Sequence, residues 1–316
     1  MSARRVCYFV FTATVLVLIG TKVVHWMPHP SNYVVNIPVQ DNSCSTAPTK
    51  QAELMSPEEI VQYLHWTNST SCQLAVDFGF DVAVWGGMAA PDGQKAVCLD
   101  QVIAPVYGKC LVYSFGIKNL WSFDEDMAQF GCQVYSFDPS MGVDDHNRTE
   151  RIHFFNLGLA GKDEVNAQGW NMKTASSIYR MLSDRHGATK LIDVFKIDIE
   201  FYEWEVILQM LKSGFLAEKV LQFAVEIHFH AEDPLEIFQR RVRILQDLES
   251  TYPLSYSNDI GGFVRFSSRP NSGLKRPLTI LGGKEGYIGF EVAWYNSRFY
   301  NSNGSHSKDR VFPYYK

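Results

Sequence analysis

The chain has 316 residues, of which 46% are hydrophobic, 20% charged and 14% aromatic. This is the composition of a packed globular protein, and it excludes a disordered or fibrous chain. The formal net charge of −5 argues against a surface dominated by Lys and Arg, so we do not expect nucleic acid as a partner.

The N-terminal residues predict the compartment. Arg4 and Arg5 precede a mainly apolar stretch over residues 6–24, close to the roughly 20 residues that a helix needs to span a bilayer. The preceding arginines place the N-terminus in the cytosol. We predict a cytosolic tail over 1–5 and an uncleaved transmembrane signal anchor over 6–24. A cleaved signal peptide is the alternative, although Gly20-Thr21-Lys22 is a poor cleavage site.

The remainder is then expected in the lumen of the ER or Golgi, as in a single-pass type II membrane protein. Release of this part as a secreted form is the alternative. Sequons at Asn68, Asn147 and Asn303 agree with this location. Five of the six cysteines follow the anchor, and disulfides persist in an oxidising lumen. This odd number leaves one cysteine unpaired or bonded to another chain, and Cys44 allows a disulfide-linked homodimer.

The sequence divides the luminal part into a stem over 25–55, a domain over 56–300 and a C-terminal tail over 301–316. The stem is rich in Pro, Ser, Thr and Asn and shows no periodicity. The domain opens with Ser56-Pro57-Glu58-Glu59, a capping box that predicts a helix through Ile60, Leu64 and Trp66.

Strands and helices alternate along the predicted domain. We expect strands over 110–115, 133–137, 152–157, 191–197 and 221–228, with helices over 121–130, 174–186, 203–212 and 233–248. Two closing strands, over 262–266 and 290–295, suit an antiparallel hairpin at a sheet edge. The predicted fold is α/β and Rossmann-like, with a mostly parallel seven-stranded sheet and helices on both faces. Ligands bind at the carboxyl ends of such strands.

The first two strands carry a candidate cofactor site. The first ends at Ser114-Phe115-Gly116, and the second ends at Asp138 about 22 residues later, where an acid can hold ribose hydroxyls. Gly116 lets the backbone approach a ligand closely, and the lack of a second glycine in its loop counts against a pyrophosphate cofactor such as NAD. We assign Ser114, Gly116, Asp138 and Gly158 to a nucleoside cofactor. A turn role is the alternative for Asp138.

Two later segments carry a resemblance to a known family. They are Lys196-Ile197-Asp198-Ile199-Glu200 with Glu203-Trp204-Glu205, and Glu226-Ile227-His228. Over roughly 98–300 the chain resembles the FkbM-like branch of class I S-adenosylmethionine-dependent methyltransferases. It is most similar to the methyltransferase-like 24 group, with Tyr113-Ser114-Phe115-Gly116 and Trp121-Ser122-Phe123 in support. The resemblance implies S-adenosylmethionine as the cofactor. Phe201 stands where the branch has glycine, so we expect a differently shaped loop there.

Asp198, Glu226 and His228 are the candidate catalytic residues. Asp198 ends the fourth strand and would orient the cofactor's amino group or the substrate; it is assigned to cofactor binding as well. Glu226 and His228 alternate on one strand and share a face. His228 is the expected base for a hydroxyl acceptor, and a purely structural histidine is the alternative. We expect no metal, although these three residues with His230 would offer a divalent-cation site.

The predicted function is O-methylation of a luminal glycan or protein acceptor, whose identity the sequence does not give. One alternative is a Golgi-type glycosyltransferase, for which Asp124-Glu125-Asp126 has the letters of a metal-binding motif. Another is a non-catalytic binding protein with a methyltransferase fold. We expect Lys196 and Trp204 to be structural.

Overall fold

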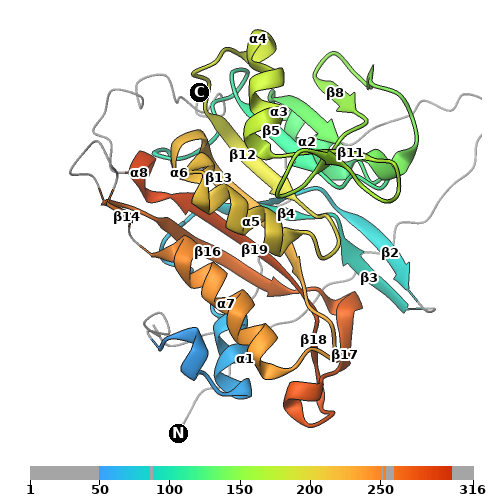
Figure 1. Cartoon of the computed structure of the whole chain (residues 1–316). Helices are drawn as coiled ribbons and strands as arrows, with labels where there is room; N and C mark the ends of the chain where they lie inside the picture. Colours follow the sequence, from blue (N-terminus) through green and yellow to red (C-terminus); the bar gives the residue numbers. More distant parts are fainter. Residues whose placement is uncertain (1–49, 86–87, 251, 254–259, 301–316) are drawn as a thin grey trace, which may run out of the picture. The chain divides into compact units, whose positions relative to one another are not determined.

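The computed structural model describes residues 50–300 except 86–87, 251 and 254–259 (Figure 1). The predicted cytosolic tail, the anchor over 6–24, most of the stem and the tail over 301–316 lie outside the described residues. Within the described part, no helix combines the length and the apolar character needed to cross a bilayer.

A mixed eight-stranded sheet forms the centre of the domain, in the order β16-β19-β13-β12-β5-β6-β8-β7. The strands are β5 (Leu111–Phe115), β6 (Gln133–Phe137), β7 (His146–Asn147), β8 (Ile152–Phe155), β12 (Ile192–Ile197), β13 (Val220–His228), β16 (Phe263–Pro270) and β19 (Gly289–Asn296). Strands β13, β12, β5, β6 and β8 run parallel, whereas β19 is antiparallel to both β13 and β16. The predicted fold class is confirmed; the additional strand is β7, a two-residue edge strand antiparallel to β8.

Most of the α-helices in the described residues pack on one face of the sheet, and five of them supply its apolar layer. They are α1 (Pro57–His65), α3 (Ala175–Met181), α5 (Glu203–Lys212), α6 (Phe215–Lys219) and α7 (Leu235–Glu249). Figure 1 shows α5, α6 and α7 in front of β13, β19 and β16. Alternate strand residues such as Tyr113, Phe195 and Phe223 point into this layer and are fully buried. Burial on both faces explains why these strands read as continuous apolar runs in the sequence.

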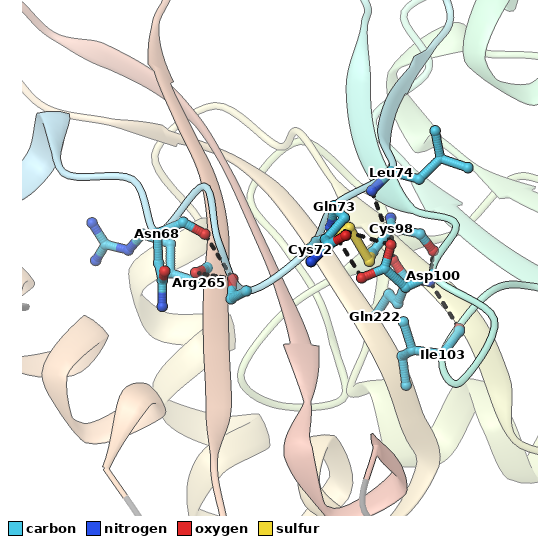
Figure 2. The surroundings of a disulfide bond; sticks show 10 residues. Asn68, Cys72, Gln73, Leu74, Cys98, Asp100, Ile103, Gln222 and Arg265 are labelled. Carbon is cyan, nitrogen blue, oxygen red and sulfur yellow. Dashed lines mark hydrogen bonds between the residues drawn. A yellow bond between two sulfur atoms is a disulfide. The ribbon is translucent and has the colours of Figure 1, made fainter. Parts of the chain in front are cut away.

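The opposite face is covered by α2 (Ser122–Gln129) and by an antiparallel ribbon of β1 (Ala75–Phe78) and β4 (Lys95–Cys98). This ribbon takes the place of a second helical layer over β13 and β19, and the sequence analysis did not predict it. A disulfide joins Cys72 to Cys98, and the Gln222 side chain of β13 donates to and accepts from the Cys98 backbone (Figure 2). The end of β4 is therefore fixed to the centre of the sheet. A second disulfide joins Cys110 to Cys132.

The remaining elements are short. They are η1 (Ala52–Leu54), β2 (Asp81–Trp85), β3 (Met88–Asp92), η2 (Pro139–Met141), β9 (Gly158–Leu159), β10 (Glu164–Val165), β11 (Asn171–Lys173), α4 (Ser183–His186), β14 (Tyr252–Pro253), β15 (Ile260–Gly261), η3 (Ser272–Leu274), β17 (Lys275–Pro277), η4 (Thr279–Leu281), β18 (Glu285–Tyr287) and α8 (Ser297–Tyr300). The predicted helix over 174–186 is divided into α3 and α4 at Leu182.

The first helix begins as the sequence predicts. The Ser56 hydroxyl accepts from the Glu59 backbone amide, and Glu59 accepts from the Ser56 amide, which completes the capping box. Residues just before it, assigned to the stem, belong to the packed domain: Ala52 is fully buried and its amide donates to Gln246 of α7.

Arg265 connects three elements of the helical face. From β16, its guanidinium donates to Glu249 Oε1 at 2.7 Å and to the Tyr63 carbonyl at 2.9 Å, and it lies over the Tyr63 ring.

Because the Arg265 side chain is fully buried, we expect Arg265→Met to lower the free energy of unfolding by about 3 kcal/mol. Urea denaturation measures this. Arg243→Met, which removes an exposed pair with Asp247, should change it by less than about 0.5 kcal/mol; equal effects would contradict the prediction.

Candidate active site

A cavity of about 680 Å³ opens at the carboxyl ends of β5, β6, β12 and β13. Its volume lies within the usual range for small-molecule and cofactor sites. Six of the seven residues predicted to form the site line it: Gly116, Asp138, Gly158, Asp198, Glu226 and His228. The cofactor candidates and the catalytic candidates therefore share one cavity.

Ser114 is the predicted residue that does not line the cavity. It is fully buried, and its hydroxyl donates to the Asp124 carboxylate of α2, as does the hydroxyl of Ser136. Ser114 therefore fastens α2 to the sheet beneath the site.

Because Asp124 is buried in this contact, the Asp124-Glu125-Asp126 run is not a surface metal motif, and the observation behind the glycosyltransferase alternative is lost.

Gly116 is required by the packing of two strand ends. Its φ is +76°, and a Cβ at this position would lie 1.6 Å from the Asp198 carbonyl oxygen. The glycine thus lets the ends of β5 and β12 approach one another; it also lines the cavity, and the close approach of a ligand to its backbone stays a prediction. Lys196 ties the same two strands together, since its ammonium donates to the carbonyls of Phe115 and Gly116. Its predicted structural role agrees with these contacts.

Asp138 is held rigidly at the end of β6. Its Oδ2 accepts from the Lys118 amide at 2.7 Å, and its Oδ1 accepts from the Ser140 amide and hydroxyl at 2.8 and 2.6 Å. Asp138 therefore has the turn role that was the alternative prediction, and it also lines the cavity. Oδ2 keeps one free lone pair, and Oδ1 gains one when the Ser140 hydroxyl turns away from it, so both roles are compatible.

His228 lies between two glutamates at the end of β13. Its Nδ1 is 3.0 Å from Glu203 Oε1 and its Nε2 is 3.6 Å from Glu226 Oε1, which confirms that residues 226 and 228 share a face. Burial lowers the pKa of His228, but the hydrogen bond and charge of Glu203, with Asp198 and Glu200, outweigh it and raise the pKa to about 9. The buried Trp204 indole donates to the His228 carbonyl, the structural role predicted for it.

Sequence reasoning missed a buried lysine under the cavity. The Lys95 ammonium of β4 lies 2.7 Å from Glu291, 3.3 Å from Asp198 and 3.8 Å from Glu226. Burial would raise the pKa of Asp198, but Lys95 and then Lys196 outweigh burial and hold it below its usual value. Burial raises the pKa of both Glu226 and Glu291. An acid inside the apolar strand over 290–295 was a usable sequence signal for Glu291. No such signal marked Lys95, because the ribbon that carries it was not predicted.

Phe201 adopts the backbone conformation of a glycine. Its φ is +74°, and that of Glu200 is +51°, so the loop after β12 has the left-handed conformation that glycine adopts without strain. The Phe201 ring stacks on His230 with centroids 4.0 Å apart, and it also contacts His228. His230 is exposed and lies beyond the end of β13, so it does not join the side chains of the predicted metal alternative.

The strain at residue 201 can be measured. Both Phe201→Gly and Phe201→Ala lose the ring contacts, but only alanine keeps a Cβ at positive φ, so we expect the glycine variant to be more stable by about 1 kcal/mol. Urea denaturation compares the two. The same pair of substitutions at Phe130, whose φ is −62°, should give the opposite order. An alanine variant at 201 at least as stable as the glycine variant would contradict the left-handed assignment.

Comparison with known proteins identifies the family. The family model described as a methyltransferase domain matches residues 59–251, more than half of the chain. The chain belongs to this methyltransferase domain family. It is 30% identical over 185 residues to "Probable methyltransferase-like protein 24" of Rattus norvegicus, and 30% identical over 142 residues to the protein of that name from Homo sapiens. These matches cover 55% and 43% of this chain.

The same matches cover 48% of the rat protein and 38% of the human protein, so the chain spans about half of these curated relatives at most. The resemblance to the methyltransferase-like 24 group is confirmed, and membership of the methyltransferase family supports S-adenosylmethionine as the cofactor.

Two solved structures are also similar. The Methanococcus jannaschii fibrillarin pre-rRNA processing protein aligns with a TM-score of 0.32 and 10% identity, covering 70% of this chain and 87% of that protein. SMU.776 in complex with SAH aligns with a TM-score of 0.31 and 9% identity, covering 68% and 56% respectively. Both scores are low, and the fold assignment rests on the strand order of this domain itself.

Proposed function

We propose that this domain transfers a methyl group from S-adenosylmethionine to a hydroxyl group of a glycan or protein in the secretory pathway. The observation that carries the proposal is the single cavity that unites Gly116, Asp138 and Gly158 with Asp198, Glu226 and His228. Membership of the methyltransferase family supports methyl transfer. The oxygen acceptor and the compartment are further parts of this proposal.

The cavity offers groups that suit S-adenosylmethionine. Asp138 carries a fixed carboxylate at the end of β6, where it would accept the two ribose hydroxyls. The apolar side chains of Ile117, Leu159 and Met172 line the same cavity and would contact the adenine ring. Asp198 is ionised and would attract the cofactor's ammonium group. When bound, S-adenosylmethionine supplies an electrophilic methyl group on a positively charged sulfur.

His228 is arranged to remove the acceptor's proton. When its neutral imidazole donates Nδ1–H to Glu203, Nε2 keeps a lone pair. The acceptor oxygen would form a bond to the methyl carbon as the carbon–sulfur bond breaks. The electron pair of the broken bond would remain on sulfur. The hydroxyl proton would pass to Nε2 of His228. Because the pKa of His228 is about 9, this base form becomes abundant only at alkaline pH.

Three features support a secretory location. Cysteines 72, 98, 110 and 132 form two disulfides, which persist in oxidising compartments. Asn147 is an exposed residue in an Asn-x-Thr sequon. The apolar stretch over 6–24 follows two arginines. We therefore propose a single-pass anchor with the domain in the lumen.

Glycosylation tests this location. Expressed in a eukaryotic cell, the full chain is expected to lose apparent mass on treatment with an N-glycosidase, and Asn147→Gln should remove one glycan from it. Electrophoresis measures both shifts. Unchanged mobility of the wild-type chain after N-glycosidase treatment would contradict a luminal domain.

Calorimetric titration of the glycosylated protein with S-adenosylmethionine and S-adenosylhomocysteine tests the function directly. Micromolar binding of either is expected. Absence of binding to a folded protein would overturn the proposal, and a nucleotide sugar titrated into the same sample would then decide between a glycosyltransferase and a protein that binds neither.

A further inference from the structure

The floor of the cavity contains the side chains of a divalent-cation site. One ligand atom each from Asp198, Glu226 and His228 lies within 4.8 Å of the others. Two carboxylates and an imidazole are common ligands of divalent cations. In parallel sheets such residues meet because neighbouring strands end at the same edge, and here the ends of β12 and β13 supply all three.

A cation of the protein itself already lies against these ligands. The Lys95 ammonium is 3.3 Å from Asp198 Oδ2, 3.8 Å from Glu226 Oε2 and 2.7 Å from Glu291 Oε1. The Lys95 side chain is 1% exposed, whereas that of Asp198 is 21% exposed. The lysine therefore approaches the carboxylates from beneath, and Asp198 keeps a side that faces the cavity.

The position of Lys95 is built into the fold. It begins β4, whose last residue is bonded to Cys72 and clamped by Gln222 of β13 (Figure 2). Strand β4 also packs across β13 and β19, the strands that carry Glu226 and Glu291. A rigid anchor three residues away thus directs the ammonium into the carboxylate cluster.

We propose that Lys95 takes the place of a divalent metal ion in this site, so that the methyltransferase works without a metal. The inference rests on the proposed function. A buried ammonium would repel a divalent cation from Asp198 and Glu226, and it balances the charge that the carboxylates would otherwise share with a metal. Lys95 is accordingly a positioning residue: its ammonium donates to Asp198 and holds that carboxylate in place without touching the substrate.

The test measures Mn²⁺ binding by the paramagnetic resonance signal of the free ion. The main variant is Lys95→Met with Glu291→Gln, which removes one positive and one negative charge and so leaves the buried cluster with the same net charge. We expect it to bind Mn²⁺ at least ~100-fold more tightly than the wild-type protein. His228→Ala added to this variant should abolish the gain. Lys162→Met, which alters an exposed pair with Glu164, should bind as the wild type does.

Two results would overturn the inference. One is wild-type protein that binds Mn²⁺ as tightly as the double variant; the other is a double variant with a native circular dichroism spectrum and no gain in Mn²⁺ affinity. The wild-type protein alone provides a second measurement: its affinity for S-adenosylmethionine should be unchanged in excess EDTA, and a loss would also overturn the inference. Failure of every form to bind S-adenosylmethionine would reject the proposed function instead, while the Mn²⁺ comparison still decides the role of Lys95.

Discussion

Asp138→Ala is expected to weaken S-adenosylmethionine binding by at least about 100-fold. Two hydrogen bonds from ribose hydroxyls to a carboxylate contribute about 1.5–3 kcal/mol each, and each 1.4 kcal/mol is a factor of ten in affinity. The Lys118 amide and the Ser140 amide hold this carboxylate in one orientation, so little ordering is left for binding to supply. Calorimetric titration measures the loss.

Asp138→Asn is the matched variant, because it keeps the shape of the side chain and one of its two acceptor oxygens. It is expected to bind about tenfold more weakly than the wild type, between the wild type and the alanine variant. Asp247→Ala removes a carboxylate from the exposed side of α7 and should leave the affinity unchanged. Wild-type affinity in Asp138→Ala would refute the ribose assignment.

His228→Ala is expected to lower the rate of methyl transfer by about 100-fold or more, the usual contribution of a general base, and to change cofactor affinity little. The wild-type rate should rise with pH through about 9, because only the neutral imidazole accepts a proton. Glu203→Gln removes the partner that raises this pKa, so the rise should move to lower pH. Release of S-adenosylhomocysteine between pH 6 and 10 measures both profiles.

The titration can also be followed without an acceptor. The pKa of His228, read by NMR of the histidine ring, should be about 9 in the wild type and clearly lower in Glu203→Gln. Glu205→Gln, on the exposed side of the same helix, should leave it unchanged. Since the folded pKa exceeds the ordinary value of 6.5, the His228–Glu203 pair stabilises the fold fully below pH 6.5 and loses this contribution as pH rises through 9. A wild-type pKa near 6.5 would contradict the pairing.

The sequence predicted the parallel strands because each is an apolar run that ends near a turn. Asp138, Asp198 and His228 follow directly from those ends, since the carboxyl ends of parallel strands meet at one edge. Ser114 lies one pleat further back in its strand, and its side chain points toward α2 instead. The position of a strand end must be correct to one residue for such an assignment to hold.

Two features could not be read from local patterns. Lys95 lies on a four-residue strand whose partner is β1, and its contacts join residues about 100 to 200 positions apart. The sequence around it has no periodicity long enough to predict a strand. At Phe201 the expectation of a differently shaped loop assumed that a bulky residue avoids positive φ. The ring contacts with His230 and His228 offset that cost.

The two disulfides have a consequence for how the protein must be made. They close loops of 26 and 22 residues, and each closure of this length contributes about 3 kcal/mol by restricting the unfolded chain. In a host cytoplasm that keeps thiols reduced, the end of β4 would keep its hydrogen bonds to Gln222 and its packing on β13 and β19 but would lose its bond to Cys72, so the lysine that it carries would lose its covalent anchor. Oxidative folding in a bacterial periplasm or a eukaryotic secretory pathway is therefore a condition for assembling the cavity floor, and not only for raising the yield.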